Sequence, residues 1–119
     1  GRANGILLPY VMSFNAGCAE QLTPTAKRYA QISRLLRLDT SSVRQSALHM
    51  IRTARTFIKK MNMPCTIEAA GVTKEQFEAE LDEMAAAALA DRCTATNPQP
   101  VTVEDIKEIY RKAFIGKLP

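Results

Sequence analysis

Hydrophobic and polar residues recur with a helical period along most of this chain, but residues 2–15 do not follow the pattern. When these residues are placed on a helix, apolar side chains point in nearly every direction and Arg2 is the only charged residue. A helix without a polar side belongs inside a bundle or a membrane. A stretch of this length spans only about 21 Å, which is less than the ~30 Å core of a bilayer. The pattern therefore predicts a buried central helix that ends at Gly17.

Four later stretches carry apolar residues at three- and four-residue steps, which is typical of amphipathic helices. We expect these helices over residues 24–37, from Ser41 or Ser42 to about 63, over 74–91 and over 103–115, with a short turn at 65–71. Thr23, Thr73 and Thr102 stand where N-cap residues are expected. Asp105 follows Thr102 by three residues, as in a capping box.

These elements predict an all-α fold, a helical bundle of about five to six helices around a buried first helix. No segment alternates with the period of a strand. A chain of 119 residues fits one domain, so we assign residues 1–119 to a single helical domain. Because the first helix begins with neither an initiator Met nor a capping residue, we expect this domain to be a fragment of a larger protein.

The net charge of +4 conceals two different halves. Residues 1–65 carry 10 Lys and Arg against 2 Asp and Glu, whereas residues 66–119 carry 6 against 10. Four of the cations form a stripe on the longest helix: Arg44, Arg52, Arg55 and Lys59. We expect a solvated face there, although the stripe could also meet the acidic half or a neighbouring domain. The chain has no nucleic-acid motif, so we expect no nucleic-acid binding.

Residues capable of chemistry are few. Cys18, Cys65 and Cys93 are far apart, which argues against disulfides and a zinc site, and we expect at least two of them in the core. His49 lies opposite the apolar face of its helix and is interpreted as a surface residue that binds no metal. We nominate no catalytic and no metal-binding residue. Without a signal peptide or a transmembrane-length apolar run, we expect a cytoplasmic protein with no membrane contact.

Three stretches resemble the iron-containing alcohol dehydrogenases. Residues 1–15 read GRANGILLPYVMSFN, and residues 91–98 read DRCTATNP. Both are similar to motifs of that family, the first to a core helix and the second to a signature near the C-terminus. Met63-Pro64 and the later Gly71-Val72 turn fit the same domain. The order and spacing agree from end to end, so the resemblance covers the whole chain.

The resemblance implies a parent enzyme of two domains. An N-terminal α/β domain would bind NAD(P), and a helical C-terminal domain would carry a divalent metal, usually Fe²⁺, on one Asp and three His. The last His normally stands directly before the position of Gly1, so no family ligand maps onto this chain, and His49 is not one. Cys93 matches a position bordering the nicotinamide end of the cleft, which makes it our cofactor-binding candidate. The residues alone equally allow Cys93 to be a small buried residue beside a turn.

The function implied is that of an iron-dependent, NAD(P)-linked alcohol dehydrogenase that interconverts an alcohol and its aldehyde or ketone. By itself this chain is expected to be inactive and to bind neither Fe²⁺ nor NAD(P). The partners expected are the N-terminal nucleotide-binding domain, a small alcohol or aldehyde, and further copies in a homo-oligomer. Gln99 departs from the family, where many members have Arg after Asn-Pro. The alternative is a non-enzymatic helical module whose basic first half binds an acidic partner or nucleic acid.

Overall fold

Five α-helices and no strands make up the computed structural model, which describes residues 1–119. Their bounds are α1 Arg2–Ala16, α2 Pro24–Leu35, α3 Val43–Lys60, α4 Lys74–Ala90 and α5 Val103–Ile115, with a short 3-10 turn, η1, at Thr94–Thr96. The predicted all-α class is confirmed, and each expected helix is present within a few residues of its expected bounds. None of these helices combines the length and the hydropathy that crossing a bilayer requires.

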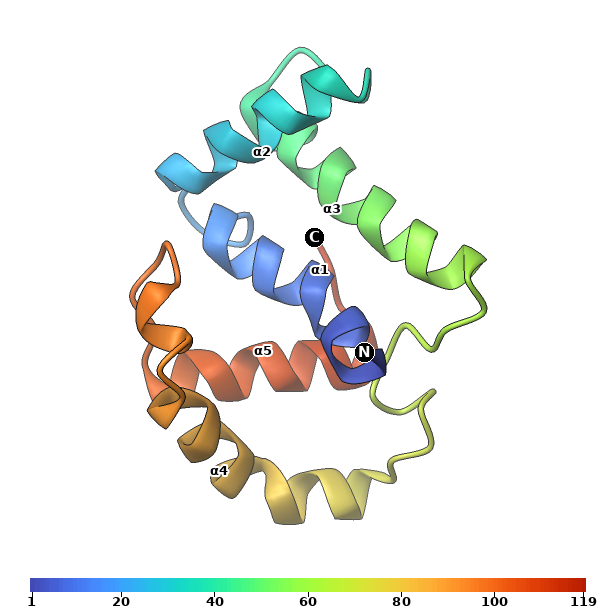
Figure 1. The fold of residues 1–119 in the computed structure, drawn as a ribbon, viewed down its shortest axis with the longest axis vertical. Helices are drawn as coiled ribbons and strands as arrows, with labels where there is room; N and C mark the ends of the chain where they lie inside the picture. The colour runs from blue at the N-terminus through green and yellow to red at the C-terminus, as the bar shows by residue number, and fades with distance from the viewer.

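Helix α1 occupies the centre of the bundle. It packs against α2, α3 and α5, and Figure 1 shows it between the α2–α3 pair and α5. It ends at Gly17, whose φ of 69° is the left-handed conformation that glycine adopts without strain. The expectation of burial on every side is wrong, because Leu8 is 48% exposed and residues 1–4 are also exposed. The cause is that α4 packs on α5 and leaves one side of α1 uncovered.

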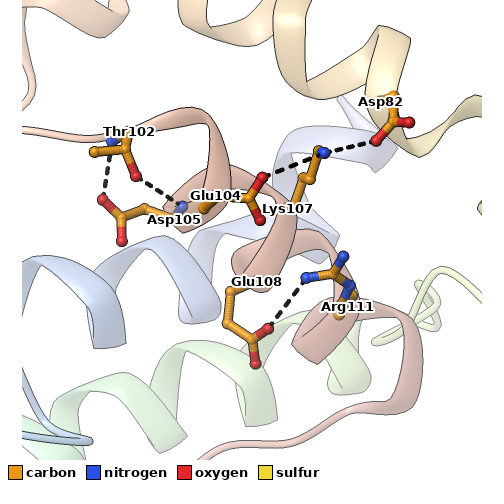
Figure 2. Close-up of polar contacts among 7 residues, drawn as sticks. All are labelled: Asp82, Thr102, Glu104, Asp105, Lys107, Glu108 and Arg111. Atoms are coloured by element: carbon orange, nitrogen blue, oxygen red, sulfur yellow. Dashed lines mark hydrogen bonds and ion pairs between the residues drawn. The ribbon is translucent and has the colours of Figure 1, made fainter.

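The helix starts follow the capping residues, with one exception. Ser42 accepts a hydrogen bond from the backbone N–H of Gln45. Thr73 and Thr102 each form a complete capping box, and Figure 2 shows the Thr102–Asp105 pair. Thr23 precedes α2, but its hydroxyl does not cap that helix. It donates to the backbone oxygen of Asn15 instead, so it ties α2 to the end of α1.

The basic stripe on α3 differs from the expected solvated face. Arg44 donates to the backbone oxygens of Cys18 and Glu20 at 2.5 and 3.3 Å. Arg52 donates to the oxygen of Pro119, at 2.7 Å from Nη2, and Arg55 to that of Gly116 at 3.2 Å. These arginines therefore hold the segments that follow α1 and α5 along α3, because guanidinium groups can satisfy carbonyls that have left a helix. Arg52 and Lys59 are nevertheless exposed, as expected for a solvated face, and Lys59 makes no such bond.

Two groups of buried side chains form the interior. The first core joins α1, α2 and α3 and comprises Met12, Ala16, Cys18, Ala26, Ala47, Leu48 and Ile51. The second core joins α4 and α5 and comprises Phe77, Leu81 and Phe114. Only Cys18 of the three cysteines is buried, so the expectation of at least two core cysteines is wrong. His49 is exposed as expected, with Nδ1 2.7 Å from the oxygen of Leu38.

Ion pairs gather on α4 and α5. Lys107 Nζ lies 2.7 Å from Asp82 Oδ1 and 3.4 Å from Glu104 Oε1, as Figure 2 shows. The Lys107–Asp82 hydrogen bond lowers the pKa of Asp82 and raises the pKa of Lys107. This pair links α5 to α4 at the surface. The acidic second half thus pairs with its own cations and not with the arginines of α3.

Candidate functional site

Two asparagines from distant parts of the chain meet beside the end of α1. Asn15 Nδ2 donates to Asn97 Oδ1 at 3.1 Å, and Asn97 Nδ2 donates to Asn15 Oδ1 at 2.8 Å. Asn15 is only 5% exposed. Buried amides need such partners, because an unpaired buried polar group is costly. This reciprocal pair joins the two stretches that carry the family resemblance, residues 1–15 and 91–98.

The orientation of both amides follows from their surroundings. Asn97 Nδ2 also donates to the backbone oxygen of Gln99 at 2.7 Å. A reversed Asn97 would place two oxygens face to face there, so the Gln99 carbonyl orients Asn97, and Asn97 in turn orients Asn15. The Tyr29 hydroxyl also lies beside Asn15. Burial raises the pKa of Tyr29, and its hydrogen bond with Asn15 partly offsets that rise.

The turn from α4 to η1 presents Cys93. Asp91 Oδ1 accepts the backbone N–H of Cys93 at 2.8 Å, and the hydroxyl of Thr96 donates to the Cys93 oxygen at 2.7 Å. Thr94 closes the turn from the other side by donating to Ala88 at 2.5 Å. Cys93 itself is exposed. The alternative interpretation of Cys93 as a small buried residue is therefore wrong.

A hollow of about 590 Å³ lies between α1, α5 and the end of α4, and we call it the Cys93 hollow. Most of its lining residues are hydrophobic. The lining residues are Asn4, Leu7, Val11, Phe14, Asn15, Ala88, Asp91, Cys93, Thr94, Asn97, Val101, Ile106, Ile109 and Tyr110. The two resembling stretches therefore share one surface depression, with Asn4 near the start of α1 and the Asn15–Asn97 pair towards its end.

A second hollow of about 830 Å³ adjoins the first, and we call it the α1–α4 groove. Leu7 and Tyr110 line both depressions. Most residues of the groove are hydrophobic, including Ile6, Phe77 and Met84. It occupies the side of α1 that α4 leaves uncovered.

The donor groups of this chain do not fit a metal site by themselves. No three His, Cys, Asp or Glu side chains lie close enough together to share an ion. The single histidine, His49, is on α3 and bonds to Leu38. What the Cys93 hollow can do is bind and orient a small, largely apolar molecule and exclude water from one side of it.

Sequence reasoning nominated Cys93 but missed Asn15 and Asn97. A usable signal was present, since Asn15 is a polar residue at the end of an otherwise apolar helix. A polar side chain in a buried stretch requires a partner. Its partner is 82 positions away in sequence, however, and only the fold reveals it.

Comparison with known proteins identifies a family whose sequence profile includes both stretches that meet at the Asn15–Asn97 pair. The sequence profile of the Fe-containing alcohol dehydrogenase family, C-terminal, matches residues 1–114. The alcohol dehydrogenase of Thermococcus barophilus is 37% identical over 96% of this chain and 27% of its own length. The NADPH-dependent butanol dehydrogenase of Clostridium saccharobutylicum is 28% identical over 98% of this chain and 28% of its own length.

A solved structure is also similar. The alcohol dehydrogenase from Oenococcus oeni superposes with a TM-score of 0.79 at 28% identity, covering 96% of this chain and 28% of that protein. The chain thus spans a little over a quarter of the length of these relatives. It belongs to the Fe-containing alcohol dehydrogenase family, of which it represents the C-terminal, helical part.

Proposed function

We propose that residues 1–119 form the helical domain of an iron-dependent, NAD(P)-linked alcohol dehydrogenase that interconverts an alcohol and its aldehyde or ketone. The observation that carries this proposal is the junction of α1 with the 91–98 turn. The profile match includes both stretches, and the Asn15–Asn97 pair brings them together around one apolar hollow. Cys93 is one of the residues that line this hollow, and there it would border the nicotinamide.

The lining of the Cys93 hollow favours a small substrate with an apolar part. Its apolar lining favours the hydrocarbon part of an alcohol, since burying apolar surface is worth about 25 cal/mol per Å². A similar relative is named for butanol and for NADPH, and we extend an alcohol of that kind and a nicotinamide cofactor to this chain as part of the proposal.

The remaining components are expected from the rest of the parent enzyme. Because residues 1–119 do not bring three metal-binding side chains together, the iron ligands would lie on polypeptide outside them. The nucleotide-binding domain would be the main partner. On its own this helical domain would be inactive. We further propose that the enzyme is cytoplasmic and assembles as a homo-oligomer.

The alternative of a basic module for nucleic acid or an acidic partner is less well supported. Three of the four cations in the α3 stripe bind backbone oxygens of the chain itself. Their donors are therefore partly occupied, and phosphate contacts would have to compete with these bonds.

The test is an assay of the full gene product. We expect the reduction of NAD⁺ or NADP⁺ by short primary alcohols, stimulated by Fe²⁺ and abolished by a chelator. Residues 1–119 expressed alone serve as the inactive comparison. A full product without activity towards any short alcohol, with either cofactor and Fe²⁺ supplied, would refute the proposal. A simpler check is the gene itself, where the codon before Gly1 should encode His.

A further inference from the structure

The turn that presents Cys93 has a single polar attachment to the central helix. Of all hydrogen bonds in the structure, only those between Asn15 and Asn97 join α1 to residues 91–101. The other bonds of the turn are local, such as those of Thr94 and Thr96. The local bonds shape the turn, but the asparagine pair decides where it sits against α1.

The geometry of the pair suits a role in positioning. Asn15 is fixed in position, because its backbone oxygen accepts a hydrogen bond from the hydroxyl of Thr23 and its side chain is buried. Asn97 is oriented by the carbonyl of Gln99. Two amides that are each held by a further contact lose little additional freedom when they pair, so the pair defines one geometry. Cys93 is only four residues from this anchor.

We propose that Asn97 is a positioning residue, which through Asn15 holds the Cys93 turn against α1 and so sets the width of the Cys93 hollow for the substrate and nicotinamide. This inference rests on the proposed function. Asn97 would not take part in the chemistry itself. Its loss would let the turn move away from α1, which weakens binding of the ground state and the transition state alike.

The kinetic test compares variants of the full gene product. Asn97→Ala should raise KM for the alcohol about tenfold while kcat changes less than about twofold, as expected when uniform binding is lost. Asn97→Asp keeps the size of the side chain but cannot donate to Asn15 or Gln99, so it should act in the same direction. The double variant N15A/N97A should be no worse than N97A, because the two residues act as one unit.

A second measurement does not depend on activity. The backbone N–H groups of Thr94, Thr96 and Asn97 bond within the turn, to Asp91, Cys93 and Thr94. Their hydrogen exchange should become several-fold faster in N97A. The matched control is Asn62→Ala at the end of α3, where Asn62 has a φ of 58° and does not line the Cys93 hollow. Asn62→Ala should lower stability but leave both KM and exchange at 94–97 unchanged.

The outcomes separate the two proposals. An active wild-type protein in which N97A and N97D leave KM unchanged, or in which N97A leaves exchange at 94–97 unchanged, would overturn the positioning role. A KM increase of the same size in N62A would overturn it as well, since a general loss of stability would then explain the effect. A wild-type protein with no alcohol-dependent activity would refute the proposed function and, with it, the role in substrate binding. Exchange would still show whether the pair holds the turn.

Discussion

The two cores of this molecule are built in different ways. In the first core, alanines at 16, 26 and 47 are completely buried, which lets α1, α2 and α3 approach closely around larger residues such as Ile51. In the second core, the rings of Phe77 and Phe114 stack with centroids 4.7 Å apart and an interplanar angle of 20°. This aromatic pair joins α4 to α5, with Leu81 buried beside it.

The two cores also differ in how fully the surrounding helices enclose them. The first core is enclosed by three helices, and the backbone segments beside it are held by Arg44, Arg52 and Arg55. The second core is covered by two helices only and borders the apolar α1–α4 groove. We therefore regard α1, α2 and α3 as the scaffold of the domain and call α4 and α5, with the Cys93 turn between them, the α4–α5 arm.

The largest effect expected in this comparison of the two cores is that of Ile51→Ala. Ile51 is fully buried in the first core, so the cavity left behind should lower the free energy of unfolding by about 2–5 kcal/mol. Urea denaturation followed by circular dichroism measures the change. Ile115→Ala is the control, since that side chain is 65% exposed and should change stability by less than about 0.5 kcal/mol. Equal effects of the two variants would contradict the proposed scaffold.

A smaller effect is expected from Phe77→Leu in the second core. Leucine keeps most of the apolar volume but loses the stacking with Phe114, so the free energy of unfolding should fall by about 1.5 kcal/mol. Hydrogen exchange should quicken in α4 and α5 and remain unchanged in α1 to α3. The control is Phe57→Leu, at a side chain that is 62% exposed. Faster exchange throughout the chain would show that the two cores are not separate.

Removing one helix cap in each part of the molecule compares the two parts by the same kind of change. Thr102→Ala removes the capping box of α5, and Ser42→Ala removes the cap of α3, each with an expected loss of about 1 kcal/mol. The loss at Thr102 should appear as faster exchange confined to the arm. Thermal unfolding of both variants measures the totals. Ser41→Ala, next to the real cap, should have no effect, and a loss there equal to that of Ser42→Ala would contradict the assignment.

The smallest effect concerns the surface pair that links α5 to α4. The pKa of Asp82 is lowered by Lys107, so its contribution to stability is present above the ordinary pKa of a carboxyl and is lost as the pH falls through the lowered value. The pKa of Lys107 is raised, so its contribution is present below the ordinary pKa of lysine and is lost as the pH rises through the raised value. The pair therefore stabilises the arm fully between about pH 4 and 10, which are the ordinary pKa values of the two groups, and the stabilisation declines outside that range.

Asp82→Asn should accordingly give the smallest decrease in melting temperature of these variants. The decrease should be measurable at neutral pH and low salt and should vanish in about 1 M salt, because exposed charges are screened. Glu83→Gln is the control, since the neighbouring Glu83 has no ion-pair partner. A decrease that persists in high salt would mean that Asp82 acts through packing instead of charge.

Local features of the chain sufficed to predict much of the fold. Apolar spacing and caps such as Thr102 with Asp105 placed all five helices, and the apolar character of residues 2–15 identified the central helix. These signals are local because a helix is built from bonds between residues four apart. The same reasoning identified Cys93 as a candidate, through a resemblance confined to a short stretch.

Contacts between distant residues were decided by the tertiary structure alone. Thr23 lost its expected capping role to Asn15, the arginines of α3 bound carbonyls from two other segments, and Asn15 met Asn97. In each case the polar group had several possible partners, and the one it found depended on how the helices cross. The residue sequence determined which helices form and which of their faces are apolar. Packing determined which polar groups share a buried space, because only the folded topology brings them within hydrogen-bonding distance.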